Sequence, residues 1–95
     1  MFDYLEKFNK LSKELRDKIS SPGAIGAIEG LEKKYGVNLA IVIMKVMAKD
    51  IAVNNLDTYF IDEFKLDRAR AIELANELKE GVFFNVSEYL ELNKA

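Results

Sequence analysis

Four carboxylates are the side chains of this sequence best placed to do chemistry together. Asp57, Asp62, Glu63 and Asp67 fall within residues 51–67, where a single lysine opposes them and leaves a net charge of −3. Carboxylates held close together bind a divalent cation or work as an acid–base pair. Asp57 and Asp62 are five residues apart on a predicted helix and diverge, and the spacing of an EF-hand loop is absent. We therefore interpret the four residues as helix caps and a polar face, with no metal site and no catalytic residue.

Two residue types that enzymes use most are missing. The 95 residues include neither histidine nor cysteine. The usual ligands of zinc, haem and iron–sulfur clusters are therefore excluded, as are the commonest general base and the commonest strong nucleophile. The four tyrosines fall mostly at helical core positions, which favours packing over catalysis. We predict a protein that is not an enzyme, that needs no cofactor and that has no evident small-molecule substrate.

The composition indicates a folded domain without a strong charge bias. Apolar residues make up 49% of the chain and charged residues 32%, with a net charge of −2. Such a chain can bury a core and has no general attraction to nucleic acid or to anionic lipid, so we expect neither partner. Without disulfides, the fold depends on its core alone. The N-terminal segment lacks the apolar stretch of a secretory signal, and we expect a cytoplasmic location.

The most apolar stretch, LAIVIMKVMA from Leu39 to Ala48, contains one charged residue, Lys45. At about 1.5 Å per residue, ten helical residues cover about 15 Å, which is half the hydrocarbon core of a bilayer and too short to span it. A helix that is apolar on all sides is normally buried. We therefore expect a central helix over about residues 39–49, with only the edge that carries Lys45 and Lys49 facing water.

The remaining sequence predicts short helices around this central one. Apolar periodicity and capping signals predict helices over residues 3–19, 22–35, 56–64 and 68–80. A last short helix over residues 82–92 would place five apolar residues at helical spacing, namely Val82, Phe83, Val86, Tyr89 and Leu90. Ser21 with Pro22, Gly36 and Asp67 supply the clearest caps. The predicted fold is all-α, a compact orthogonal bundle of five or six short helices forming a single domain over residues 1–95.

The segment KKYGVNLAIVIMKVM resembles the helix-turn-helix phrase in which Gly-Val-Ser/Asn joins a first helix to a DNA-recognition helix. The resemblance implies a small nucleic-acid-binding domain, which is the alternative function. In that motif the second helix presents polar and basic side chains to bases and phosphates. Here the corresponding positions are Leu39, Ala40, Ile43 and Met44, whose side chains donate no hydrogen bond. Lys45 also falls where the motif has an inward aliphatic residue, so we prefer a different function.

Two features favour contact with another protein. If one side of the central helix is left uncovered, then Ile43, Met44 and Met47 form an apolar patch that suits a second copy or an amphipathic helix. Gly26 and Gly30 lie one turn apart, which permits close approach of another helix but is also compatible with a tolerated weak helix. The preferred hypothesis is a non-enzymatic protein–protein interaction module, able to self-associate as a homodimer through these five residues.

Overall fold

The computed structural model describes residues 3–90, and every structural statement below refers to them. These residues form seven α-helices, two short 3₁₀ segments and no strand. The helices are α1 (Asp3–Asn9), α2 (Lys13–Ile19), α3 (Pro22–Tyr35), α4 (Ala40–Met47), α5 (Leu56–Phe64), α6 (Arg68–Gly81) and α7 (Ser87–Leu90). The 3₁₀ segments are η1 (Val53–Asn55) before α5 and η2 (Phe83–Val86) before α7. The predicted all-α class is therefore confirmed.

The predicted bounds agree closely with α3, α5 and α6, and local capping explains the agreement for α3 and α6. The backbone N–H of Ala24 donates to Ser21 Oγ at 3.3 Å, and the N–H of Arg70 donates to Asp67 Oδ1 at 2.8 Å. Gly36 follows α3 with a φ of 67°, the left-handed conformation that glycine adopts without a steric penalty. These caps satisfy backbone groups that a helix end leaves unpaired, and thus fix where each helix begins or ends.

The prediction of one continuous helix over residues 3–19 is wrong. α1 ends at Asn9 and α2 begins at Lys13. The backbone N–H of Leu15 donates to Ser12 Oγ at 3.2 Å, and such a local bond competes with continuation of the helix. Because of the break, α1 packs against α4 while α2 packs against η2 and α3.

The apolar stretch forms the centre of the core, as expected. Leu39, Val46 and Met47 have no exposed surface, and Val42 is 1% exposed. Both ends of the described chain cover α4, since α1 packs against it and the hydroxyl of Tyr89 donates to the Met47 carbonyl oxygen at 2.7 Å. Side chains from the other helices complete the buried cluster, the largest being Phe60, Phe83, Leu56, Leu74, Leu78 and Val82.

The predicted lysine edge of the central helix is open to water at Lys49 and half-buried at Lys45. Lys45 Nζ lies 5.5 Å from the centroid of the Tyr4 ring, and Lys49 Nζ lies 4.7 Å from that of Tyr89. A lysine can lay its methylene chain on apolar surface while its ammonium group lies over an aromatic face. Tyr4 therefore covers the half-buried Lys45, whereas Lys49, which follows the end of α4, is exposed beside Tyr89, as expected.

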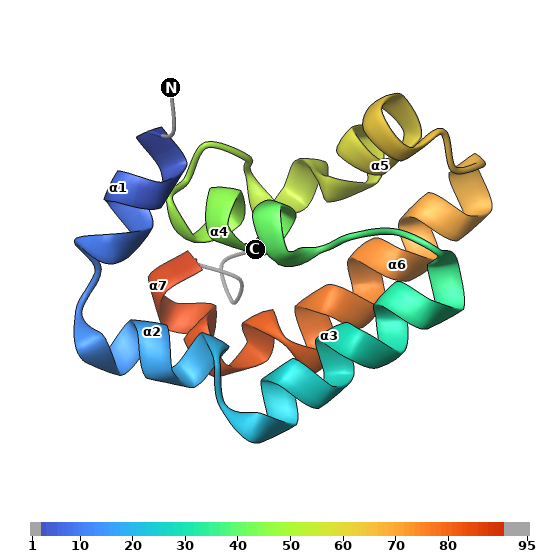
Figure 1. The fold of residues 1–95 in the computed structure, drawn as a ribbon. Coiled ribbons are helices and arrows are strands. Elements are labelled where there is room, and N and C mark those ends of the chain that lie inside the picture. Colours follow the sequence, from blue (N-terminus) through green and yellow to red (C-terminus); the bar gives the residue numbers. More distant parts are fainter. Residues whose placement is uncertain (1–2, 91–95) are drawn as a thin grey trace.

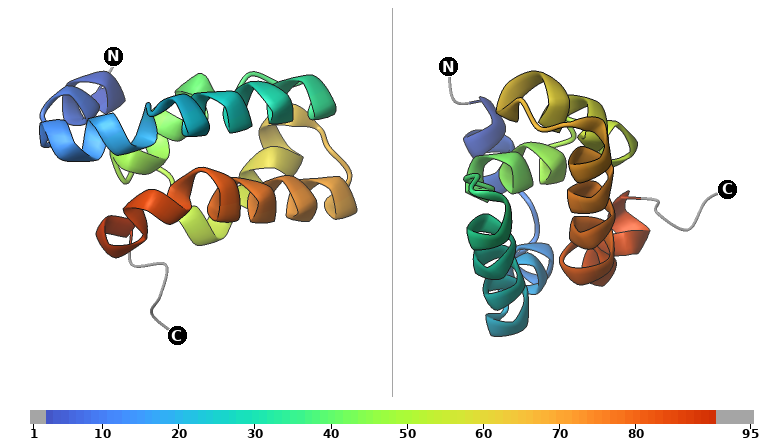
Figure 2. Two further views of the ribbon diagram at one scale, coloured as in Figure 1. Left: turned by 90° about the horizontal axis from the view of Figure 1, so that it is seen from below. Right: turned by 90° about the vertical axis from the view of Figure 1, so that its right-hand side faces the viewer.

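The arrangement of the helices gives the molecule two distinct ends. Figure 1 shows α1 and α2 at one end and the corner between α5 and α6 at the opposite end. Figure 2 shows that α3 and α6 run alongside each other between those ends, and the Cβ of Ala27 lies 3.9 Å from the position a Cβ would take on Gly81. The seam between α3 and α6 also brings polar side chains of the two helices together.

Candidate functional site

The structure uses two of the predicted interface residues inside the chain itself. Ile43 is 5% exposed and Met47 is fully buried, so a partner bound to the folded chain does not reach either side chain. Met44 is half-buried. The exposed large apolar side chain of α4 is Ile41, which is 44% exposed and was not among the predicted residues. Ile43 and Met47 are not available to a partner because α1 and α7 cover the face of α4 that the sequence left open.

The two predicted glycines lie on an open surface of α3. Gly26 and Gly30 are exposed, and a Cβ built on either would meet no other heavy atom within 4 Å. Packing within the chain therefore gives no reason for glycine at these positions, although an interior helical glycine costs about 0.5 to 1 kcal/mol relative to alanine. Ile25, on the same helix, is 44% exposed. An interface at this face stays a prediction.

The four carboxylates between residues 57 and 67 do not converge. Asp67 caps α6 as predicted, and Asp57 Oδ1 accepts a hydrogen bond from the N–H of Thr58 at 2.9 Å. Asp62 and Glu63 are exposed on α5. Within residues 3–90, no three acidic side chains gather closely enough to hold a metal ion.

A polar cluster that the sequence did not reveal joins α3 to α6. The Tyr35 side chain is buried, at 6% exposure, and its hydroxyl lies within hydrogen-bonding distance of Glu73 and of Glu77 Oε2, the latter at 2.6 Å. Lys34 Nζ lies 3.0 Å from Glu77 Oε1 and 3.7 Å from Glu73 Oε1. Arg70 lies over the Tyr35 ring at 5.1 Å from its centroid and donates to the Lys34 carbonyl oxygen at 3.2 Å. We call these five residues the Tyr35 cluster.

The electrostatics of the Tyr35 cluster suit a structural contact better than catalysis. Burial, together with the two neighbouring carboxylates, raises the pKa of the Tyr35 phenol far above its usual range. The hydrogen bond from Tyr35, followed by the contact with Lys34, lowers the pKa of the Glu77 carboxyl. The phenol therefore stays protonated at any physiological pH. It donates hydrogen bonds to the carboxylates and does not act as a base. The cluster fastens α3 to α6.

The lowered pKa of Glu77 makes the stability of the fold sensitive to acid. A carboxyl whose pKa is lower in the folded than in the unfolded chain stabilises the fold above its ordinary pKa, near 4.5, and loses this effect as the pH falls through the folded value. We expect Glu77→Gln to flatten the loss of stability between about pH 5 and pH 3, measured by urea unfolding at a series of pH values. Glu80→Gln, at an exposed position on the same helix, serves as the control. An acid limb equally steep in Glu77→Gln and in the unmodified chain would contradict this assignment.

One aromatic side chain is conspicuously left outside the core. Phe84 is 68% exposed, whereas its neighbour Phe83 is fully buried and Val86 is 3% exposed. The two buried side chains anchor η2 to the core, so the backbone that carries Phe84 is fixed in place. Ile72 on α6 adds a smaller exposed apolar side chain, at 37%. The surface therefore offers separate apolar contact points on η2, α3, α4 and α6.

Comparisons with models of protein families, with curated proteins and with solved structures find no match to this chain. In addition, none of the helices within residues 3–90 combines the length and the apolar character needed to cross a membrane.

Proposed function

We propose that this chain is a non-enzymatic protein–protein interaction module that associates with a second copy of itself. The observation that carries the proposal is the exposed aromatic ring of Phe84 on a backbone held by its buried neighbours. A rigidly presented aromatic side chain loses little conformational entropy on binding, and such side chains supply much of the energy of protein interfaces.

The outer face of α3 supplies the second support. Gly26 and Gly30 leave room for another backbone to approach, and Ile25 offers apolar surface on the same helix. These glycines weaken the helix, and the packing of the chain does not require them. A close helix–helix contact with a partner gives a reason for both positions.

The polar groups of the chain also support a non-enzymatic role. The best-formed polar arrangement, the Tyr35 cluster, satisfies its own hydrogen bonds, and its phenol is held in the protonated form.

The nucleic-acid alternative gains little support from α4, because the chain buries Leu39 and Ile43 of the proposed recognition helix, and the most exposed large side chain of this helix is Ile41. A helix that reads bases needs polar side chains at such positions.

Sedimentation velocity over a wide range of protein concentration tests the proposal. We expect the unmodified chain to associate as its concentration rises, and Phe84→Ser to shift the association constant by about tenfold or more toward monomer. Gly30→Ala should also weaken association while it raises the free energy of unfolding by about 0.5 to 1 kcal/mol, because the added methyl group has open space in the monomer.

The two variants separate an interface from damage to the fold, since a variant that is more stable and less associated has lost a contact between chains. Asn76→Ser, at an exposed position of α6, is the matched surface control and should leave both quantities unchanged. A chain that remains monomeric at the highest concentration, with Phe84→Ser indistinguishable from it, would refute self-association.

A further inference from the structure

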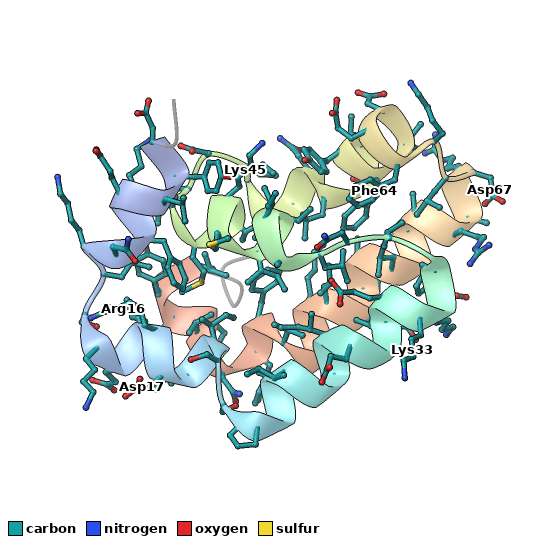
Figure 3. The ribbon with its side chains drawn as sticks, viewed as in Figure 1. Arg16, Asp17, Lys33, Lys45, Phe64 and Asp67 are labelled. Atoms are coloured by element: carbon teal, nitrogen blue, oxygen red, sulfur yellow. The ribbon has the colours of Figure 1, made fainter. Side chains whose placement is uncertain are left out.

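Three exposed cations at one end of the molecule form no ion pair with any described residue. Lys33 lies in the last turn of α3, Lys65 follows the end of α5, and Arg68 is the first residue of α6. The ion pairs that the structure shows involve other basic residues, namely Lys7, Lys18 and Lys34. Figure 3 shows Lys33 and Asp67, which immediately precedes Arg68, at the same end of the molecule.

Two further cations belong to this end and are held in fixed positions. Arg70 donates from its guanidinium to the carbonyl oxygen of Lys34, which ties the start of α6 to the end of α3. The ring of Tyr35 supports both side chains, at 5.1 Å from Arg70 and 5.3 Å from Lys34. The carboxylate of Asp67, in contrast, is already engaged in capping α6. We call Lys33, Lys34, Lys65, Arg68 and Arg70 the basic end.

Lys33 and Lys34 suit the negative end of the α3 dipole and Arg70 bonds to α3, but the stability of the fold does not account for Lys65 and Arg68. Lys65 has a φ of 58°, a left-handed conformation in which glycine would avoid a steric penalty. Arg68 and Arg70 lie in the first turn of α6, which contains no acidic residue, although the positive end of the helix dipole disfavours cations there. Residues that depart from the locally stabilising choice are expected where a surface has a function.

We propose that the basic end binds an acidic segment of a partner protein, a short stretch with several aspartates or glutamates. Ammonium and guanidinium groups form charge-assisted hydrogen bonds with carboxylates, and opposite charge also speeds the encounter of the two surfaces. An extended segment of six residues covers about 20 Å, enough to contact several of these cations in turn.

The surroundings of the basic end favour a short acidic peptide over a nucleic acid. The chain as a whole has a net charge of −2, and the exposed carboxylates of Asp62 and Glu63 lie on α5, within one turn of Lys65. A long polyanion that leaves the basic end would pass over negative surface and be repelled. A segment with a few carboxylates need contact only the cations themselves.

Fluorescence anisotropy with a labelled oligoglutamate peptide at low ionic strength tests the proposal. We expect Lys33→Gln with Arg68→Gln to weaken binding by about tenfold, and added salt to weaken binding further. Lys10→Gln with Lys13→Gln removes the same charge from exposed positions just after α1 and at the start of α2, and should change the affinity by less than about twofold. Lys65→Gly should weaken binding while it raises stability, which separates loss of a contact from loss of the fold.

Several results would overturn the proposal. An absence of peptide binding at low ionic strength is one, and equal losses from the two double variants are another, because they would indicate a response to net charge alone. Tighter binding of a short DNA duplex or single strand than of the peptide, lost in the Lys33 and Arg68 double variant, would assign the basic end to nucleic acid instead. All of the variants in the peptide-binding experiment keep Phe84. A negative result in that experiment therefore does not affect the sedimentation test of self-association.

Discussion

Replacing Phe83 with alanine is expected to lower the free energy of unfolding by about 3 to 5 kcal/mol. The ring is fully buried and belongs to the same cluster as Phe60, Leu74 and Leu78. Its removal takes away transfer free energy and leaves a cavity, since η2 packs against α2, α6 and α7 and a close-packed core relaxes only in part. Urea unfolding followed by circular dichroism measures the change, with the slope of the transition checking that the same surface is exposed in both chains.

The adjacent residue gives a matched control of the same size and chemistry. Phe84→Ala should change the free energy of unfolding by no more than about 0.5 kcal/mol, because 68% of the side chain is already in water. If Phe84→Ala were as costly as Phe83→Ala, the ring would be packed in solution, and the proposed contact surface on η2 would not exist. A negligible cost also means that the Phe84→Ser sedimentation experiment reports on association and not on unfolding.

The contrast between these two phenylalanines was partly visible in the sequence. The helical spacing of Val82, Phe83 and Val86 places Phe83 among the inward residues and leaves Phe84 out of the series. The pattern does not say that η2 is a 3₁₀ segment, because that depends on how the chain after α6 packs against α2. Periodicity therefore predicts that the Phe83 ring faces inward, whereas the exposed fraction of the Phe84 ring depends on how the neighbouring helices pack around it.

Helix ends were predictable where a side chain next to the helix sets them. Ser21 with Pro22, Gly36 and Asp67 act through bonds or dihedral angles within a few residues, so the sequence contains the whole cause. The break before Ser12 was hidden because the apolar residues on both sides of it keep helical spacing. When the apolar periodicity continues through a capping serine, a prediction based on periodicity alone misses the end of the helix at that position.

The features that could not be predicted depend on contacts between helices that are far apart in the sequence. Tyr35 and its acceptors are 38 and 42 residues apart, and nothing local to α3 or α6 requires them to meet. The same limit applies to α4, whose apolar surface predicted burial but not which helices would cover Ile43 and Met47. Glu73 and Glu77, four residues apart on one face of α6, were the available sign that a donor would be needed opposite them.

Replacing Tyr35 with phenylalanine is expected to lower the free energy of unfolding by about 1.5 to 2 kcal/mol. The buried ring stays, so the loss comes from the hydroxyl that donates to Glu73 and Glu77. The side chains of these glutamates are 57% and 36% exposed, so water can solvate the released carboxylates and hold the loss to the lower part of the range for hydrogen bonds to charged groups. Urea unfolding at neutral pH measures this change.

The dependence on pH then separates a hydrogen-bonded fastening from simple packing of the ring. Because the bond from Tyr35 is the main cause of the lowered pKa of Glu77, Tyr35→Phe should return this pKa toward its ordinary value and flatten the acid limb, as Glu77→Gln does. The double variant should then lose less stability than the sum of the two single variants, since both remove one contact. If the losses of stability were additive and the decline of stability in acid were unchanged, Tyr35 would stabilise the contact between α3 and α6 through its ring alone. The carboxylates of Glu73 and Glu77 would then have other partners.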